Sequence, residues 1–254
     1  KGYHVLLEKP MSPNEQECRD MVNKSLEKGL ILMVCHVLRY APFYEKLKEI
    51  IDEGRIGQIV NIQHTENVSY WHFAHSFVRG IFRNETISSP WILAKSCHDL
   101  DMITYLMNKK CKSVISNGNL MHFRKENAPD GAPEYCLDNC PHEKTCQYFA
   151  PALYLKQITD VTWPSDVISV DTSYVSRYEA LKKGPYGRCV YKCDNDVVDH
   201  QSAIFEMEDG STATFNMIGF SSENTRTIRI YGTKGDIRAH QGRNEIEIYD
   251  FLTG

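Results

Sequence analysis

The sequence predicts an α/β segment followed by an α+β domain, and three of its features carry this prediction. Continuous apolar runs at 5–7 and 30–36 flank an amphipathic stretch at 12–29, as in a strand–helix–strand crossover of a parallel sheet. The last third instead alternates apolar and polar residues in successive segments, which are joined at turn signals such as Asp209-Gly210. That pattern predicts a large, mostly antiparallel open β-sheet flanked by helices.

The first of two expected domains covers residues 1–36. Residues 3–8 predict a strand, and Ser12, Pro13 and Glu15 predict a helix start with Ser12 as N-cap and a capping box. Gly29 predicts the helix end, and "LILMVCH" (30–36) predicts the second strand.

The second expected domain covers residues 37–254. "APFYEKLKEIIDEGRIG" predicts an amphipathic helix, "QIVNIQHTENVSYW" (58–71) a long strand and "WILAKSCHDLDMITYLM" (91–107) another helix. "KSVISNGNLMHF" (112–123) predicts strand, turn and strand, and the polar stretch 125–150 predicts a loop insertion. Further strands are expected in "HQSAIFEMEDGSTATFNMIGF", "RTIRIYGTKGDIRAH" and "NEIEIYDF".

Bulk composition narrows the class of protein. The 254 residues are 42% hydrophobic and 24% charged, which is typical of a globular protein with a large core. A formal net charge of −4 argues against a nucleic-acid-binding protein. No apolar run approaches the roughly 18 residues of a membrane helix. We therefore expect a protein that binds neither nucleic acid nor membrane and is located in the cytoplasm.

The helix expected at 91–107 carries a candidate proton-transfer group. His98 has Asp101 one turn after it and Lys95 one turn before it. The carboxylate would raise the basicity of the imidazole, and the lysine would lower it. A surface helix end with scattered charges is the alternative. The stripe expected to face the core comprises Leu93, Cys97, Leu100, Thr104 and Met107.

Lys9 directly follows the first buried strand. Charged residues at this position point into the crevice at the carboxyl end of a parallel sheet, where ligands bind. The alternative is a solvated loop lysine that precedes a chain turn at Pro10.

Four separated segments resemble the Gfo/Idh/MocA oxidoreductases, the relatives of glucose–fructose oxidoreductase and inositol dehydrogenase. They are "EKP" (8–10), "HVLRYAPFYEKLKEIIDEGRIGQIV", "KSCHDLDMITYL" and "IRIYGTKGDI", in the family's order and at similar spacing. The resemblance implies a Rossmann dinucleotide-binding domain followed by a substrate domain. Because the fifteen glycines never form G-x-G-x-x-G, residues 1–36 are expected to be the last part of a truncated Rossmann domain.

The resemblance also implies the cofactor and the catalytic residues. NAD or NADP is the expected cofactor, with Glu8, Lys9 and Pro10 at its nicotinamide end and the main binding loop absent from this chain. Lys9 matches the lysine that contacts substrate and nicotinamide, and His98 matches the histidine that takes the hydroxyl proton. Many relatives carry an aspartate where this chain has Ala94. Either Lys95 takes over that role or Asp101 alone orients the imidazole.

Several polar and aromatic side chains are candidates for substrate binding. The segment "SYWHFAHSFVRGIFRN" is dense in groups that bind sugars, and Arg39 and Tyr40 follow the second strand. A structural loop with satisfied histidines is the alternative for this segment. The candidates are Arg39, Tyr40, Trp71, His72, His75 and Arg79.

The insertion contains a cysteine-rich stretch, "CLDNCPHEKTC". Cys136, Cys140, His142 and Cys146 could form a structural zinc site, with Cys189 or Cys193 as a further ligand. A loop of free thiols is the alternative.

Three functions remain open. The first is hydride transfer from a sugar or cyclitol-like hydroxyl to NAD(P), with this chain inactive by itself. The second is NAD-assisted glycoside hydrolysis, which part of the family performs. The third is a non-catalytic sugar-binding or oligomerisation module. In each case we expect a carbohydrate-like ligand and a homo-oligomer formed through the open sheet.

Overall fold

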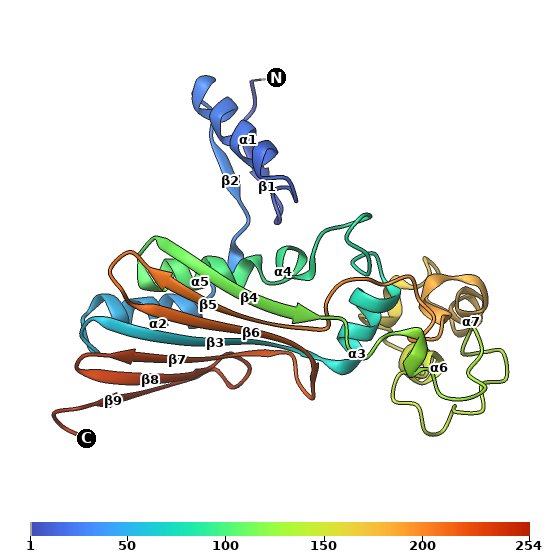
Figure 1. Cartoon of the computed structure of the whole chain (residues 1–254). Helices are drawn as coiled ribbons and strands as arrows, with labels where there is room; N and C mark the ends of the chain where they lie inside the picture. Colours follow the sequence, from blue (N-terminus) through green and yellow to red (C-terminus); the bar gives the residue numbers. More distant parts are fainter. Residues whose placement is uncertain (1) are drawn as a thin grey trace.

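The protein consists of a small lobe that stands above a large sheet with helices behind it (Figure 1). This computed structural model describes residues 2–254, so residue 1 of the expected 1–36 domain lies outside it. The elements are β1 (Val5–Leu7), α1 (Glu15–Glu27), β2 (Leu32–Val34), α2 (Pro42–Asp52), β3 (Ile59–Ser69), α3 (Tyr70–Phe73), α4 (Trp91–Ala94), α5 (Cys97–Met107), β4 (Cys111–Asn119), α6 (Ala150–Tyr154), α7 (Tyr174–Lys183), β5 (His200–Met207), β6 (Thr212–Ser221), β7 (Thr225–Gly232), β8 (Gly235–His240) and β9 (Glu245–Asp250).

The large sheet has seven strands in the order β4-β5-β6-β3-β7-β8-β9. Its long central strand β3 runs parallel to β6, and the other neighbours are antiparallel. β5 and β6 are joined at Asp209-Gly210, where Gly210 has φ +85°, a backbone conformation that glycine adopts without steric cost. The expected mixed fold with a mostly antiparallel open sheet is confirmed.

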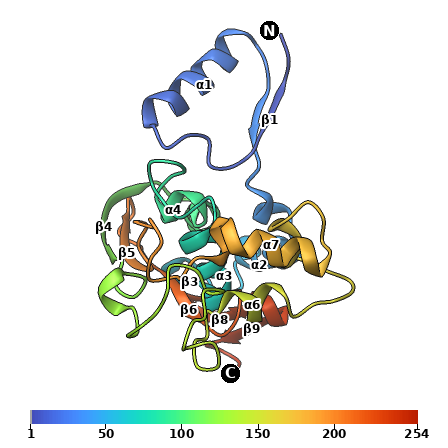
Figure 2. The same ribbon diagram turned by 90° about the vertical axis from the view of Figure 1, so that its right-hand side faces the viewer.

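One face of the sheet carries the core. On β3, Ile62, His64, Glu66 and Val68 are buried, while the residues between them are more exposed, because side chains alternate between the two faces of a strand. Helices α2 and α5 lie behind the sheet and cover its buried face (Figure 1), and Figure 2 shows the same layers from the end at which α6 and α7 lie. The apolar side expected of the 41–57 helix is confirmed at Phe43, Leu47 and Ile50, which are buried, and Ile51 packs partly buried beside them.

The small lobe is the expected strand–helix–strand crossover, with β1 and β2 parallel. The helix start differs from the prediction: Asn14, not Ser12, is the N-cap, and its side chain accepts hydrogen bonds from the Gln16 and Glu17 backbone amides. Ser12 Oγ instead accepts from the Asn14 amide, two residues on, whereas a capping box requires the amide three residues on. Gly29, at φ +61°, follows the helix end as predicted.

The strands of this lobe present apolar side chains to solvent. Leu6 on β1 is 69% exposed and Met33 on β2 is 41% exposed. A hollow of about 450 Å³ lies between α1 and the two strands. Both apolar runs have the composition of strands that are covered on both faces. Among residues 2–254, however, no other element covers the outer face of these two strands.

Two segments differ from the sequence prediction. The helix expected over 91–107 is broken into α4 and α5 at Lys95 and Ser96. Residues 111–119 form one strand, because β4 pairs with β5 along its whole length and Gly118 lies within the pairing rather than in a turn.

Candidate active site

Lys9 lies where the small lobe meets the main body. It follows β1, and its Nζ donates a 2.9 Å hydrogen bond to the carbonyl of Ala94, at the end of α4. Beside this contact is a cavity of about 730 Å³, with Pro10 and Met11 on one wall and Phe82 and Ala94 on the other. A cavity therefore adjoins the carboxyl end of β1; Pro10 and Ala94 line it, and the placing of Lys9 in a ligand crevice stays a prediction.

His98 occupies the first turn of α5, near Lys9. Burial, the Lys9 ammonium and the Arg226 guanidinium together lower the pKa of His98 to about 4. Its Nδ1 is buried and has no hydrogen-bond partner among residues 2–254. The imidazole is therefore neutral at pH 7, as a group that accepts a proton must be.

Asp101 is held by Arg39 rather than by His98. The guanidinium of Arg39 donates two hydrogen bonds to its carboxylate, 2.8 Å from Nε and 2.5 Å from Nη2, and lies over the Tyr105 ring. This pair joins the turn after β2 to α5, which explains the position of Arg39. Tyr40 beside it is largely exposed. The Asp101 carboxylate bonds Arg39 and not His98, so the hydrogen bonds do not support the alternative in which Asp101 alone orients the imidazole.

Lys95 lies at the break between α4 and α5, so it is not one helical turn before His98 as the sequence predicted. Its Nζ lies 3.2 Å from Glu66 Oε1 on the central strand β3. Together with burial, its charge lowers the pKa of His72 to about 4. The helix break therefore places Lys95 next to the aromatic segment that follows β3.

A buried network of charges lies beneath α5, and no local sequence pattern predicts it. Arg226 on β7 bonds Asp99 Oδ1 at 2.6 Å and lies 2.8 Å from Glu66 Oε2. Asp99 also lies 2.7 Å from His64 Nε2. Burial would raise the pKa of Asp99, but the hydrogen bond from His64 and the Arg226 charge lower it to about 2. The network fixes α5, and with it His98, to the sheet.

The predicted substrate-binding segment divides into an exposed and a buried part. Trp71 and His72 on α3 are partly exposed. His75 is 3% exposed, and its Nδ1 lies 2.9 Å from the Tyr154 hydroxyl. Arg79 is fully buried and donates to the carbonyls of Arg188 and Tyr148. The prediction that Arg79 contacts substrate is wrong, because its guanidinium is enclosed by backbone acceptors.

His75 makes the stability of the protein depend on pH. Burial and its neighbours His72 and Arg79 lower its pKa to about 4. Unfolding therefore takes up a proton between about pH 6.5 and pH 4, so stability is lost as pH falls through this range. We expect His75→Gln to show a shallower loss, measured as the urea midpoint at pH 7 and at pH 5. Equal slopes for both proteins would contradict this, and between pH 7 and 9 their midpoints should run parallel.

The cysteine insertion does not form the expected zinc site. Among residues 2–254, no three His, Cys, Asp or Glu side chains are arranged to hold a metal ion. The His142 ring bonds the Asp130 carbonyl, and the Arg79 guanidinium shares a narrow cavity with the thiols, where its charge opposes a bound cation. The prediction is wrong for Cys136, Cys140, His142 and Cys146, and equally for Cys189 and Cys193; all of these cysteines are free thiols.

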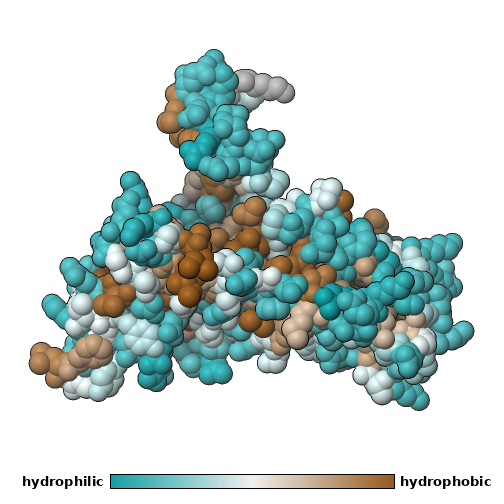
Figure 3. Space-filling view, in the orientation of Figure 1, coloured by the Kyte–Doolittle hydropathy of each residue, from teal (hydrophilic) through white to brown (hydrophobic). Residues whose placement is uncertain are grey.

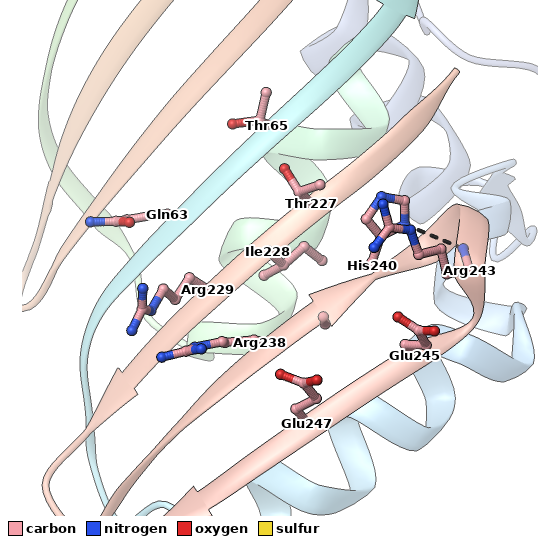
Figure 4. Close-up of a pocket in the computed structure, with 11 residues that line it drawn as sticks. Gln63, Thr65, Thr227, Ile228, Arg229, Arg238, His240, Arg243, Glu245 and Glu247 are labelled. Atoms are coloured by element: carbon pink, nitrogen blue, oxygen red, sulfur yellow. Dashed lines mark hydrogen bonds between the residues drawn. The ribbon is translucent and has the colours of Figure 1, made fainter. Parts of the chain in front are cut away.

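The uncovered face of the sheet has a shallow hollow of about 340 Å³ (Figure 4). Strand register places one row of side chains across this face, from apolar to charged: Ile115, Ile204, Thr214, Gln63, Arg229, Arg238 and Glu247. Apolar patches interrupt the polar surface in this view (Figure 3). Such a face suits contact with a second copy, and the expected homo-oligomer stays a prediction.

Residues 48–249 match the model of an oxidoreductase family, described as "Oxidoreductase family, C-terminal alpha/beta domain". The chain belongs to the Gfo/Idh/MocA oxidoreductases. No helix among residues 2–254 is long and apolar enough to span a bilayer.

Individual relatives agree with this family. YteT of Bacillus subtilis (strain 168) is 24% identical over 245 residues, covering 93% of this chain and 54% of that protein. A 1,5-anhydro-D-fructose reductase of Ensifer adhaerens is 28% identical over 132 residues, which cover 51% of this chain and 38% of the reductase. The structure of levoglucosan dehydrogenase in complex with NADH superposes with a TM-score of 0.63 at 18% identity, covering 100% of this chain and 52% of that one. The chain thus spans about half the length of YteT and of levoglucosan dehydrogenase.

Proposed function

We propose that this chain supplies the substrate side of an NAD(P)-dependent oxidoreductase, which moves hydride between a sugar or cyclitol-like hydroxyl and the nicotinamide. The observation that carries the proposal is that Lys9 bonds the Ala94 carbonyl, four residues before His98, and that its charge acts on the His98 imidazole. Lys9 and His98 come from different parts of the chain, and the Lys9 charge helps to keep the imidazole neutral. The sugar-related names of the reductase and the dehydrogenase support the substrate class.

The residues present fit the nicotinamide end of a dinucleotide. β1 and β2 are parallel, and Glu8, Lys9 and Pro10 follow β1 beside the 730 Å³ cavity. A nicotinamide bound there would supply the hydride acceptor. The glycine-rich pyrophosphate loop is not part of this sequence, so we propose that the 254-residue chain is inactive by itself.

In the proposed mechanism, oxidation of a carbinol to a carbonyl releases one hydride and one proton. His98 takes the proton from the hydroxyl oxygen, because its imidazole is neutral at pH 7. The Lys9 ammonium stabilises the negative charge that develops on that oxygen. Lys95, paired with Glu66, lies where it can orient another hydroxyl of the substrate.

The test uses a longer form of the protein, which spans the full length of its relatives, beside the 254-residue chain. We expect NADH or NADPH to bind the longer form only, seen by nucleotide fluorescence, and the longer form to reduce NAD(P) with a sugar or cyclitol from a panel. Binding by neither form would favour the non-catalytic module. Glycoside cleavage without net NAD(P)H would favour the hydrolase.

A further inference from the structure

Three aromatic groups meet beside Lys95, and one of them comes from a distant part of the chain. Trp163 lies in the loop before α7, and its ring centroid is 5.5 Å from Trp71 and 4.8 Å from His72 on α3. Trp163 is 42% exposed, and Trp71 is partly exposed. The indole pair is therefore a partly open surface rather than core.

Structural contacts hold these rings in place. The buried His75 packs edge-on against Trp163 at 5.2 Å and stacks on Tyr186 at 4.8 Å. On the other side, Asn224 Oδ1 accepts a hydrogen bond from the Ser69 amide at 2.8 Å and lies 2.9 Å from His72 Nδ1. Groups fixed in this way lose little entropy when a ligand binds.

The same contacts define the polar edge of the surface. Because the Ser69 amide can only donate, Asn224 Oδ1 is an acceptor, so the proton on neutral His72 is on Nδ1. His72 Nε2 is then an acceptor. The Lys95 ammonium nearby, held by Glu66, is a donor. Flat apolar rings with one acceptor and one donor at the edge match a pyranose, whose C–H face is apolar and whose hydroxyls radiate from its rim.

This surface is connected to the proposed reaction site through one turn of chain. Lys9 bonds the Ala94 carbonyl, and Lys95, the next residue, extends toward Glu66 and His72. The Lys95 charge acts on His72, whose ring packs against both Trp71 and Trp163, so the indole pair lies on the side of this turn toward which Lys95 extends.

We propose that Trp71 and Trp163, with His72 and Lys95 at their edge, form a second sugar subsite that binds the ring next to the one that is oxidised. The preferred substrate is then a disaccharide or other glycoside rather than a free monosaccharide. This inference rests on the proposed function for the reacting ring.

The test compares Trp163→Ala and Trp163→Phe in the full-length enzyme. The probes are cellobiose, maltose, lactose and melibiose against glucose and galactose. We expect Trp163→Ala to lower the disaccharide-to-monosaccharide ratio of kcat/KM at least tenfold, through KM, and Trp163→Phe to keep most of it. Tyr174→Ala, an exposed aromatic on neighbouring α7, is the matched control and should leave the ratio unchanged.

An unchanged ratio in Trp163→Ala would overturn the proposal, as would a wild-type enzyme that prefers the monosaccharides. Binding gives a second readout that does not depend on turnover. The chain has three tryptophans, and Trp91 is fully buried, so disaccharide binding should change the fluorescence of the other two. If no sugar is oxidised but a disaccharide binds, and calorimetry shows that Trp163→Ala abolishes this binding, the proposed reaction fails and the subsite stands. If no disaccharide changes the fluorescence, the subsite is overturned.

Discussion

Replacing His98 with alanine should lower the turnover of the full-length enzyme by roughly a hundredfold or more. The imidazole at this position is neutral, because burial and the Lys9 charge lower its pKa to about 4. In the proposed mechanism it takes the hydroxyl proton as hydride leaves. Its removal eliminates an interaction that the transition state needs, so kcat and kcat/KM should fall together. Fluorescence titration should show NADH affinity little changed.

His36→Ala is the matched control for this prediction. The His36 ring lies edge-on to His98, with centroids 6.2 Å apart, so its loss disturbs the same crevice without removing the proposed base. We expect a fall of less than tenfold in kcat. Near-normal turnover in His98→Ala, or equal losses in both variants, would remove His98 from this role.

Lys9→Met should raise the pKa of His98 toward its usual value and move the acid limb of the kcat/KM profile to higher pH.

The sequence predicted those elements whose structure is determined by residues a few positions apart. The apolar runs of β1 and β2, the glycine that follows α1 and the turn between β5 and β6 are each encoded within a few residues. The alternation along β3 and β6 likewise predicted a sheet with one buried face. The open-sheet fold could therefore be derived before its strand order was known.

The polar parts of the site could not be derived in this way. A charged residue on a helix is normally expected at the surface, so the stripe expected to face the core contained Thr104, which is exposed, and omitted Asp99, which is fully buried. Asp99 is buried because Arg226, 127 positions away, reaches it. The break between α4 and α5 also involves a distant contact, since Lys95 at the break pairs with Glu66 on β3.

The aromatic surface illustrates the same limit. Trp71 stands in a segment dense in polar and aromatic groups, which drew attention to it, whereas Trp163 is an isolated aromatic between Thr162 and Pro164. Only the fold brings the two indoles together. Arg79 shows the opposite case, because a dense local pattern suggested a ligand and the fold enclosed the side chain.

The buried network predicts the largest loss of stability in the chain. Arg226 is 9% exposed and is the cation between Asp99 and Glu66, which are 0% and 3% exposed. Methionine fills similar space, but it leaves the Asp99 and Glu66 carboxylates in the core without the guanidinium charge between them. Removing one partner of a buried ion pair costs about 3–5 kcal/mol, because the remaining charge is left desolvated. We expect Arg226→Met to lower the free energy of unfolding by this amount, measured by urea titration at pH 7.

Two further proteins separate the network from a simple loss of packing. Arg238→Met changes an arginine on the uncovered face, whose side chain is 62% exposed, and should alter stability by less than about 0.5 kcal/mol. The triple variant Glu66→Gln, Asp99→Asn, Arg226→Met removes all three charges and should recover part of the loss, since no bare carboxylate remains. A loss below about 1 kcal/mol in Arg226→Met, or a triple variant less stable than it, would show that Arg226 is not what keeps these carboxylates in the core.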